Sequence, residues 1–145
     1  MQIDPSQYDL SQNSYTVNEF YKAYNHPFNR VADNLTVDDA SKFVEAVLLR
    51  AIPLSAILCK GFKEDHFAVI NGVVWFNAIA DYMEDKYALK AKYLTNLDGK
   101  KFSEIGRMYQ RRIEETYVSV RFMQYGDEQH MDMLFDFIDH YTRLQ

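Results

Sequence analysis

A strand–turn–helix stretch around Asn71 and Gly72 comes closest to a site that could do chemistry. A short strand runs into this turn, with Asn71 as the expected helix N-cap, and an apolar helix follows. A glycine turn that opens a helix exposes backbone N–H groups at the positive end of the helix dipole, an arrangement that binds phosphate. Here the next residues are Val73, Val74 and Trp75, which can neither neutralise a phosphate nor transfer a proton. The sequence therefore predicts the backbone of an anion site without the side chains to use it.

The other residues that commonly serve catalysis or metal binding are scattered. The four histidines form no Cys/His cluster and no HExxH pair, and no serine occupies a nucleophile elbow. Asp136 and His140 are four residues apart, a spacing typical of a surface contact on one helix face. We therefore predict no catalytic residue, no metal ligand and no cofactor. Cys59 is the single cysteine, which indicates a buried thiol and a reducing, cytoplasmic compartment.

Charge is unevenly distributed along the 145 residues, whose net charge is −5. The segment 86–112 holds eight basic residues against two acidic ones, a net charge of +6, whereas 127–145 holds five acidic residues against one arginine. Arg107 and Arg111 are four residues apart and share a helix face. This pattern predicts a contact surface for an acidic protein or a phosphate backbone; the alternative is a solvated helix face. The candidate contact residues are Lys100, Lys101, Arg107, Tyr109, Arg111 and Arg112.

The spacing of apolar residues predicts a small α+β domain. Helices are expected at 15–24, from 37 with Thr36 as N-cap until Pro53 ends the helix, after Gly72, from Ser103 and over the last residues. Strands are expected at 54–60, 66–70 and 116–124. The first two strands are expected to pair as a hairpin. Residues 1–14 are polar and are predicted to form a flexible N-terminal arm, and residues 15–145 a single domain.

Two of these helices carry an apolar stripe that is expected to face the core. In the helix from Ser103 the stripe holds Ile105, Met108 and Ile113. In the C-terminal helix it holds Met131, Leu134, Phe137, Ile138 and Tyr141. No stretch approaches the 18 apolar residues of a membrane span, and no basic region precedes an apolar one at the N-terminus, so neither membrane spanning nor secretion is predicted.

The order of these segments resembles the N-terminal domain of GmrSD-type modification-dependent restriction enzymes, a ParB/sulfiredoxin-like family. Phe28-Asn29-Arg30 is similar to an early "FQR" phrase of that family, and Ile70-Asn71-Gly72-Val73-Val74-Trp75 to its "IDGQQR" signature. The stretch from Tyr93 to Ser103, YLTNLDGKKFS, is similar to "YLPELNGKRFSDL". The resemblance runs from about residue 15 to the C-terminus, and it implies a ParB/sulfiredoxin-like fold with a short mixed sheet and four to five helices.

The departures from that signature decide the expected activity. In the family the Asp-Gly-Gln-Gln-Arg residues are associated with nucleotide binding and catalysis. Replacing Asp by Asn71, the two Gln by Val73 and Val74, and Arg by Trp75 removes a charged oxygen, hydrogen-bond donors and the guanidinium that grips phosphate. Of the equipment that the resemblance implies, only Arg30 and Gly72 remain. Trp75 is expected either to fill the former pocket as part of the core or to lie exposed as an interface anchor.

The expected function is therefore that of a small non-catalytic protein-binding module. The family's distribution suggests a phage or mobile-element protein that inhibits or modulates a host macromolecular machine, such as a defence nuclease or a transcription complex, and self-association is compatible with this reading. One alternative is a nucleotide-dependent nuclease that uses displaced residues, Arg30 with Asp81. The other is a nucleic-acid-binding protein that uses the basic segment 86–112.

Overall fold

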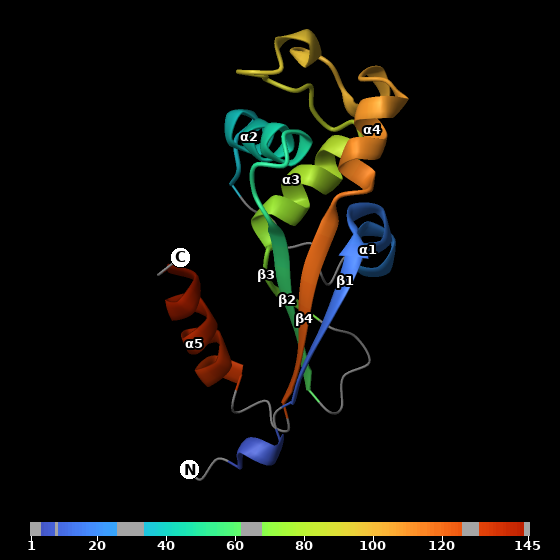
Figure 1. Cartoon of the computed structure of the whole chain (residues 1–145). Coiled ribbons are helices and arrows are strands. Elements are labelled where there is room, and N and C mark those ends of the chain that lie inside the picture. The colour runs from blue at the N-terminus through green and yellow to red at the C-terminus, as the bar shows by residue number, and fades with distance from the viewer. Residues whose placement is uncertain (1–3, 8, 26–33, 62–67, 126–130, 144–145) are drawn as a thin grey trace.

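The computed structural model describes residues 4–7, 9–25, 34–61, 68–125 and 131–143 (Figure 1). Its elements are β1 (Asp9–Thr16), α1 (Val17–Tyr24), α2 (Val37–Leu48), β2 (Leu54–Gly61), β3 (Ala68–Asn71), α3 (Val73–Met83), α4 (Arg107–Glu114), β4 (Tyr117–Tyr125) and α5 (Met131–Arg143), with 3-10 turns at Pro5–Gln7, Thr95–Leu97 and Phe102–Glu104. The strands form one mixed sheet in the order β1-β4-β2-β3. The predicted α+β class and mixed sheet are confirmed in the described part of the chain.

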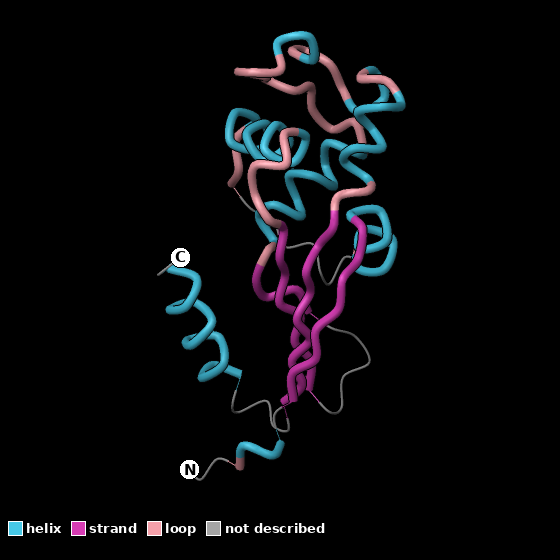
Figure 2. The backbone as a smooth tube through the Cα atoms, viewed as in Figure 1, coloured by secondary structure: helices cyan, strands magenta, loops and turns pink. Residues whose placement is uncertain are grey.

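The sheet has one buried face and one that is largely open. β2 and β3 pair antiparallel, as the sequence predicts, whereas β2 and β4 pair parallel. The strands of the sheet are magenta in Figure 2. Apolar side chains that alternate along β2 and β4 point to the buried face, where they meet α1, α2 and α3 in one core. Ser55, Tyr117 and Arg121 point to the other face and are exposed. Alternation thus separates core from solvent along most of these two strands; the exception is Cys59, which lies on the other face and is 0% exposed.

Helix α2 begins directly after its predicted cap, Thr36, whereas α1 begins at Val17 and not at the predicted residue 15, because Tyr15 and Thr16 belong to β1. The Thr16 side chain accepts a hydrogen bond from the Glu19 N–H, and the Glu19 carboxylate accepts one from the Thr16 N–H, so a capping box starts α1. Thr36 caps α2 in the same way through the Asp39 N–H, 3.1 Å away. Both helices bury their apolar face, including Phe20 and Val44, which are 0% exposed.

The N-terminal arm predicted over residues 1–14 is wrong for residues 9–14, which belong to β1. This strand lies at the edge of the sheet and pairs antiparallel with β4 along its whole length, from Asp9 opposite Gln124 to Thr16 opposite Tyr117. The polar sequence of β1 does not indicate a strand, because an edge strand can be held by its backbone hydrogen bonds while its side chains remain in water.

The predicted start of the fourth helix at Ser103 is also wrong. Residues 102–104 form a 3-10 turn, and α4 begins only at Arg107, after Gly106 with φ +88° and ψ 157°. An extended glycine with positive φ interrupts the helix, so the apolar stripe is broken. Ile105 and Ile113 are buried as predicted, but Met108 is 69% exposed.

The C-terminal helix α5 is only partly packed, contrary to its predicted apolar stripe. Leu134 and Met133 pack with Cys59 of β2 and Met123 of β4, so Cys59 is the buried thiol that the sequence predicts. Phe137 and Tyr141 are 66% and 49% exposed. Figure 1 shows the rest of α5 standing apart from the sheet. None of the described helices is long and apolar enough to cross a membrane.

Candidate functional site

The turn between β3 and α3 lies directly against the backbone of β2. The helix N-cap is Gly72, with φ +96°, and not Asn71 as the sequence predicts; no side chain caps the helix. A Cβ atom at Gly72 would lie 2.7 Å from the Ser55 carbonyl oxygen and 3.2 Å from the Ala56 Cα. Glycine is therefore required here both by its dihedral angle and by the close approach of β2.

Trp75 turns into the core, which confirms the first of its two expected environments. Its indole is 8% exposed, and its ring centroid lies 5.7 Å from that of Phe20 and 6.0 Å from that of Phe76. The indole N–H donates to the Ser55 carbonyl oxygen at 2.8 Å. The ring is also 2.8 Å from where a Cβ at Gly72 would be, so it packs against the turn itself. The single donor of this side chain is thus used within the fold.

The other residues of the expected signature have no described side chain that could bind phosphate or transfer a proton. Val73 is half-buried and Val74 is 44% exposed, and both side chains are apolar. No acidic residue lies in the first turn of α3. Arg30, which matches the arginine in the "FQR" phrase of the family that the sequence resembles, lies outside the described residues. The backbone geometry of an anion site is therefore present at Gly72, while the described side chains from Gly72 to Trp75 carry no charge.

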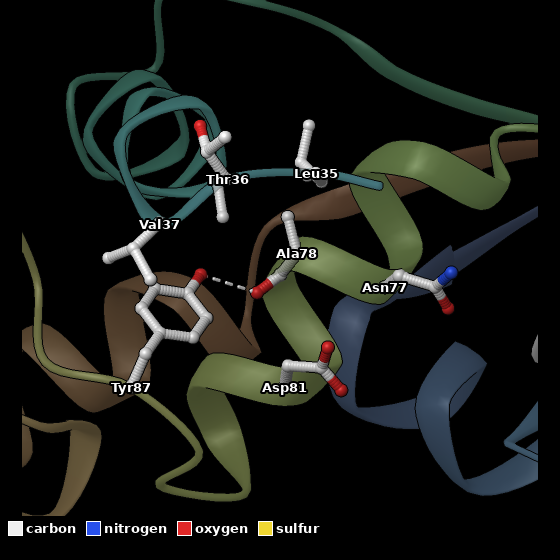
Figure 3. A pocket seen from close by; sticks show the side chains of 8 residues that line it. Leu35, Thr36, Val37, Asn77, Ala78, Asp81 and Tyr87 are labelled. Carbon is white, nitrogen blue, oxygen red and sulfur yellow. Dashed lines mark hydrogen bonds between the residues drawn. The ribbon is translucent and has the colours of Figure 1, made fainter. Parts of the chain in front are cut away.

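A small pocket lies between the start of α2 and the middle of α3 (Figure 3). Its volume is about 60 Å³, and its polar lining comes from Thr36, Asn77, Asp81 and Tyr87. The Tyr87 hydroxyl donates to the Ala78 carbonyl oxygen at 2.7 Å, and burial raises the pKa of Tyr87 well above its ordinary value. Asp81 lies 3.4 Å from the Lys86 ammonium. A pocket of this size holds a few water molecules and is far smaller than sites for nucleotide-sized ligands, at about 300 Å³ or more.

The predicted contact residues divide into two groups. Three of them make contacts within the fold. Arg107 is paired with Glu114 at 2.5 Å, and the Arg112 Nε donates to the Leu48 carbonyl oxygen. The Tyr109 hydroxyl accepts a hydrogen bond from the Asn96 side chain at 3.2 Å. The other three are Lys100, Lys101 and Arg111; these are exposed, as are Arg107 and Arg112. None of these three is ion-paired with any residue that the structure describes.

A buried carboxylate positions the loop that carries these lysines. This long loop, residues 84–106, connects α3 to α4. Glu45 of α2 is 4% exposed, and its oxygens accept backbone N–H groups from Lys92 at 2.7 Å, Tyr93 at 2.8 Å and Leu94 at 3.0 Å. Burial by itself raises the pKa of Glu45, but the three N–H donors outweigh it and hold that pKa below its ordinary value. The sequence signal for this role, overlooked in the helix pattern, is an acidic residue on the apolar face of α2.

Two further hydrogen bonds bring the long loop against α4. Asn96 bonds Tyr109, as described above, and the Gln110 side chain donates to the Phe102 carbonyl oxygen at 2.9 Å. Among the exposed side chains at this end of the molecule, we call Lys92, Tyr93, Lys100, Lys101, Met108 and Arg111 the basic tip; the acidic Asp98 and Glu104 of the same loop are exposed as well. Tyr93 and Met108 are 70% and 69% exposed. The sequence prediction included three of these cations and missed Lys92 and both apolar side chains.

Comparison with known proteins adds no relative. No protein-family model matches the chain, and neither a curated protein nor a solved structure is significantly similar to it. Within the described residues, no three His, Cys, Asp or Glu side chains are grouped so that they could hold a metal ion. The turn at Gly72 and the basic tip are therefore characterised by their own geometry alone.

Proposed function

We propose that this chain is a non-catalytic protein-binding module that derives from a ParB/sulfiredoxin-like domain of the GmrSD type. In this proposal it is encoded by a phage or mobile element and acts in the bacterial cytoplasm. It inhibits or modulates a host macromolecular machine, either a defence nuclease or a transcription complex. The phage origin and the kind of target rest on the resemblance, and the loss of catalysis rests on the geometry at Gly72.

The observation that carries the proposal is the environment of Trp75. At the position of Trp75 the resemblance implies an arginine that binds phosphate. In this chain the Trp75 indole is packed between Phe20, Phe76 and the Gly72 turn. Moving it out would break its bond to Ser55 and open a cavity in the core, at a cost of about 3 kcal/mol or more. A triphosphate held by backbone N–H groups alone lacks the bidentate bonds from a guanidinium that make such sites tight.

The basic tip is the surface that we assign to the partner. It combines four cations with an exposed Tyr93 and an exposed Met108, and tyrosine and methionine are enriched in interface cores. Glu45 fixes the backbone at residues 92–94 of this surface, so this part of the loop loses little backbone entropy when a partner binds. An acidic protein surface with apolar side chains at its centre has the complementary chemistry.

Nucleotide binding can be tested directly because Trp75 is the only tryptophan. We expect neither heat of binding nor a change in Trp75 fluorescence when ATP or GTP with Mg²⁺ is added up to about 1 mM. The matched comparison is the variant Asn71→Asp/Val73→Gln/Val74→Gln/Trp75→Arg, which restores the family signature and is followed by calorimetry. Micromolar nucleotide binding by the unmodified chain would contradict the proposal and favour the nuclease alternative.

Partner binding can be tested by affinity capture from a bacterial lysate followed by affinity measurement with the purified partner. We expect one stoichiometric protein, whose affinity falls about tenfold or more in Lys101→Glu/Arg111→Glu. Lys22→Glu is the matched control, because Lys22 and Arg111 are both exposed bases in the last turn of an eight-residue helix. Equal loss in both variants, or capture of DNA or RNA in place of a protein, would overturn the assignment of this surface.

A further inference from the structure

Helix α5 exposes more aromatic surface than its packing on the sheet explains. Leu134 is 7% exposed, but Phe135, Phe137 and Tyr141 are 41%, 66% and 49% exposed. Phe137 and Tyr141 are four residues apart and form one ridge, and Phe135 lies on another side of the helix. Large apolar side chains that gather on one exposed helix are typical of a protein–protein contact.

The same helix is acidic. Asp132 and Asp136 are exposed and one turn apart, and Phe135 lies between them in the sequence. Over residues 127–145 there are five acidic residues against one arginine. A partner for α5 must therefore offer positive charge around an apolar centre.

The basic tip of the same chain has these properties. Lys92, Lys100, Lys101 and Arg111 are exposed and are not ion-paired within the described part of the chain, and Tyr93 and Met108 lie exposed among them. A methionine thioether against aromatic rings is a favourable contact. Figure 1 shows α5 beside the sheet and well separated from α4 and the long loop, which cap the other end. The two surfaces are complementary, but they lie on different parts of one molecule.

We propose that copies of this chain associate head to tail, with α5 of one copy docked on the basic tip of the next. The contact is heterologous, so each copy keeps one free α5 and one free tip, and short open chains form as the concentration rises. The inference uses the same tip as the proposed function but requires no other protein. A host partner and a second copy would then compete for one surface.

The test is a charge swap followed by sedimentation. Variant one, Asp132→Lys/Asp136→Lys, has a basic α5 and a basic tip; variant two, Lys100→Glu/Lys101→Glu/Arg111→Glu, has an acidic α5 and an acidic tip. We expect the average mass of the unmodified chain to rise with concentration and to fall toward that of the monomer at about 0.5 M salt, where charges are screened within a few ångströms. Each variant alone should remain monomeric, and an equimolar mixture should associate again, because every α5 then meets a tip of opposite charge.

Lys22→Glu should associate like the unmodified chain, and circular dichroism and thermal unfolding should show that all variants are folded. A monomeric mass for the unmodified chain at every concentration overturns the inference. So does an association that resists both charge changes but is lost in Phe137→Ser, which would indicate symmetric contact between two α5 helices. If the unmodified chain is monomeric yet captures a partner through the tip, the inference fails and the proposed function stands.

Discussion

Glu45→Gln is expected to destabilise the protein by about 3 kcal/mol, more than any other single charge-removing substitution proposed for this chain. The carboxylate accepts three consecutive backbone N–H groups of the long loop and is almost fully buried. An amide keeps one oxygen but turns an NH₂ group toward N–H donors, which leaves at least one of them without an acceptor. The measurement is urea unfolding at neutral pH, followed by circular dichroism.

The matched control is Glu115→Gln, which makes the same chemical change at an exposed residue just after α4. We expect it to change the free energy of unfolding by less than about 0.5 kcal/mol. Equal effects in the two variants would show that the hydrogen bonds of Glu45 do not hold the loop.

Glu45 also makes the stability depend on pH in a predictable direction. Its pKa is lower in the folded chain than its ordinary value of 4.5. Its contribution is therefore fully present above that value and is lost as the pH falls through the lowered folded pKa. Between neutral pH and about pH 3, the unmodified chain should lose more stability than Glu45→Gln, so the two unfolding curves should converge in acid.

Gly72→Ala is expected to cost about 4 kcal/mol, enough to leave much of the protein unfolded. The residue has φ +96°, and the added methyl group would lie 2.7 Å from the Ser55 carbonyl oxygen and 2.8 Å from the Trp75 indole nitrogen. Neither neighbour can yield easily, since one is strand backbone and the other is a buried ring. Trp75 fluorescence during urea unfolding reports the change at the turn itself.

Gly99→Ala separates the two causes. Gly99 also has positive φ, +76°, but nothing lies within 4 Å of an added Cβ. It should cost only the conformational strain, about 1 kcal/mol. A loss at Gly72 no larger than that at Gly99 would mean that β2 and Trp75 do not approach the turn as closely as described.

Much of the fold could be predicted because its signals are local. Thr36 and the apolar spacing that follows determine α2, and alternation along β4 separates Val118 and Val120 from Tyr117 and Arg121. Gly72 marks the turn into α3. Each of these signals depends on interactions within a few residues, such as a capping bond, a period of 3.6 or 2, or a positive φ angle.

The candidate site could be predicted only in part, because it depends on which distant groups each side chain meets. Arg107, Arg111 and Arg112 look alike in the sequence and all three are exposed, yet Arg107 pairs with Glu114, Arg112 bonds the Leu48 carbonyl, and Arg111 has no ion pair among the described residues. Nothing local distinguishes them. The same is true of Met108, whose spacing predicts burial but which Gly106 turns toward solvent.

By itself the sequence determined the order and type of most elements, the glycine turn, and the absence of charged side chains at the three residues after it, since these follow from neighbouring residues. The tertiary structure decided where Trp75 points and that Glu45 accepts hydrogen bonds from the loop at residues 92–94. It also decided that residues 9–14 form an edge strand and which cations are exposed without an ion pair among the described residues. The physical reason is that burial and hydrogen-bond pairing are settled between segments far apart in the chain: Ser55 with Trp75, Glu45 with Tyr93, Leu48 with Arg112.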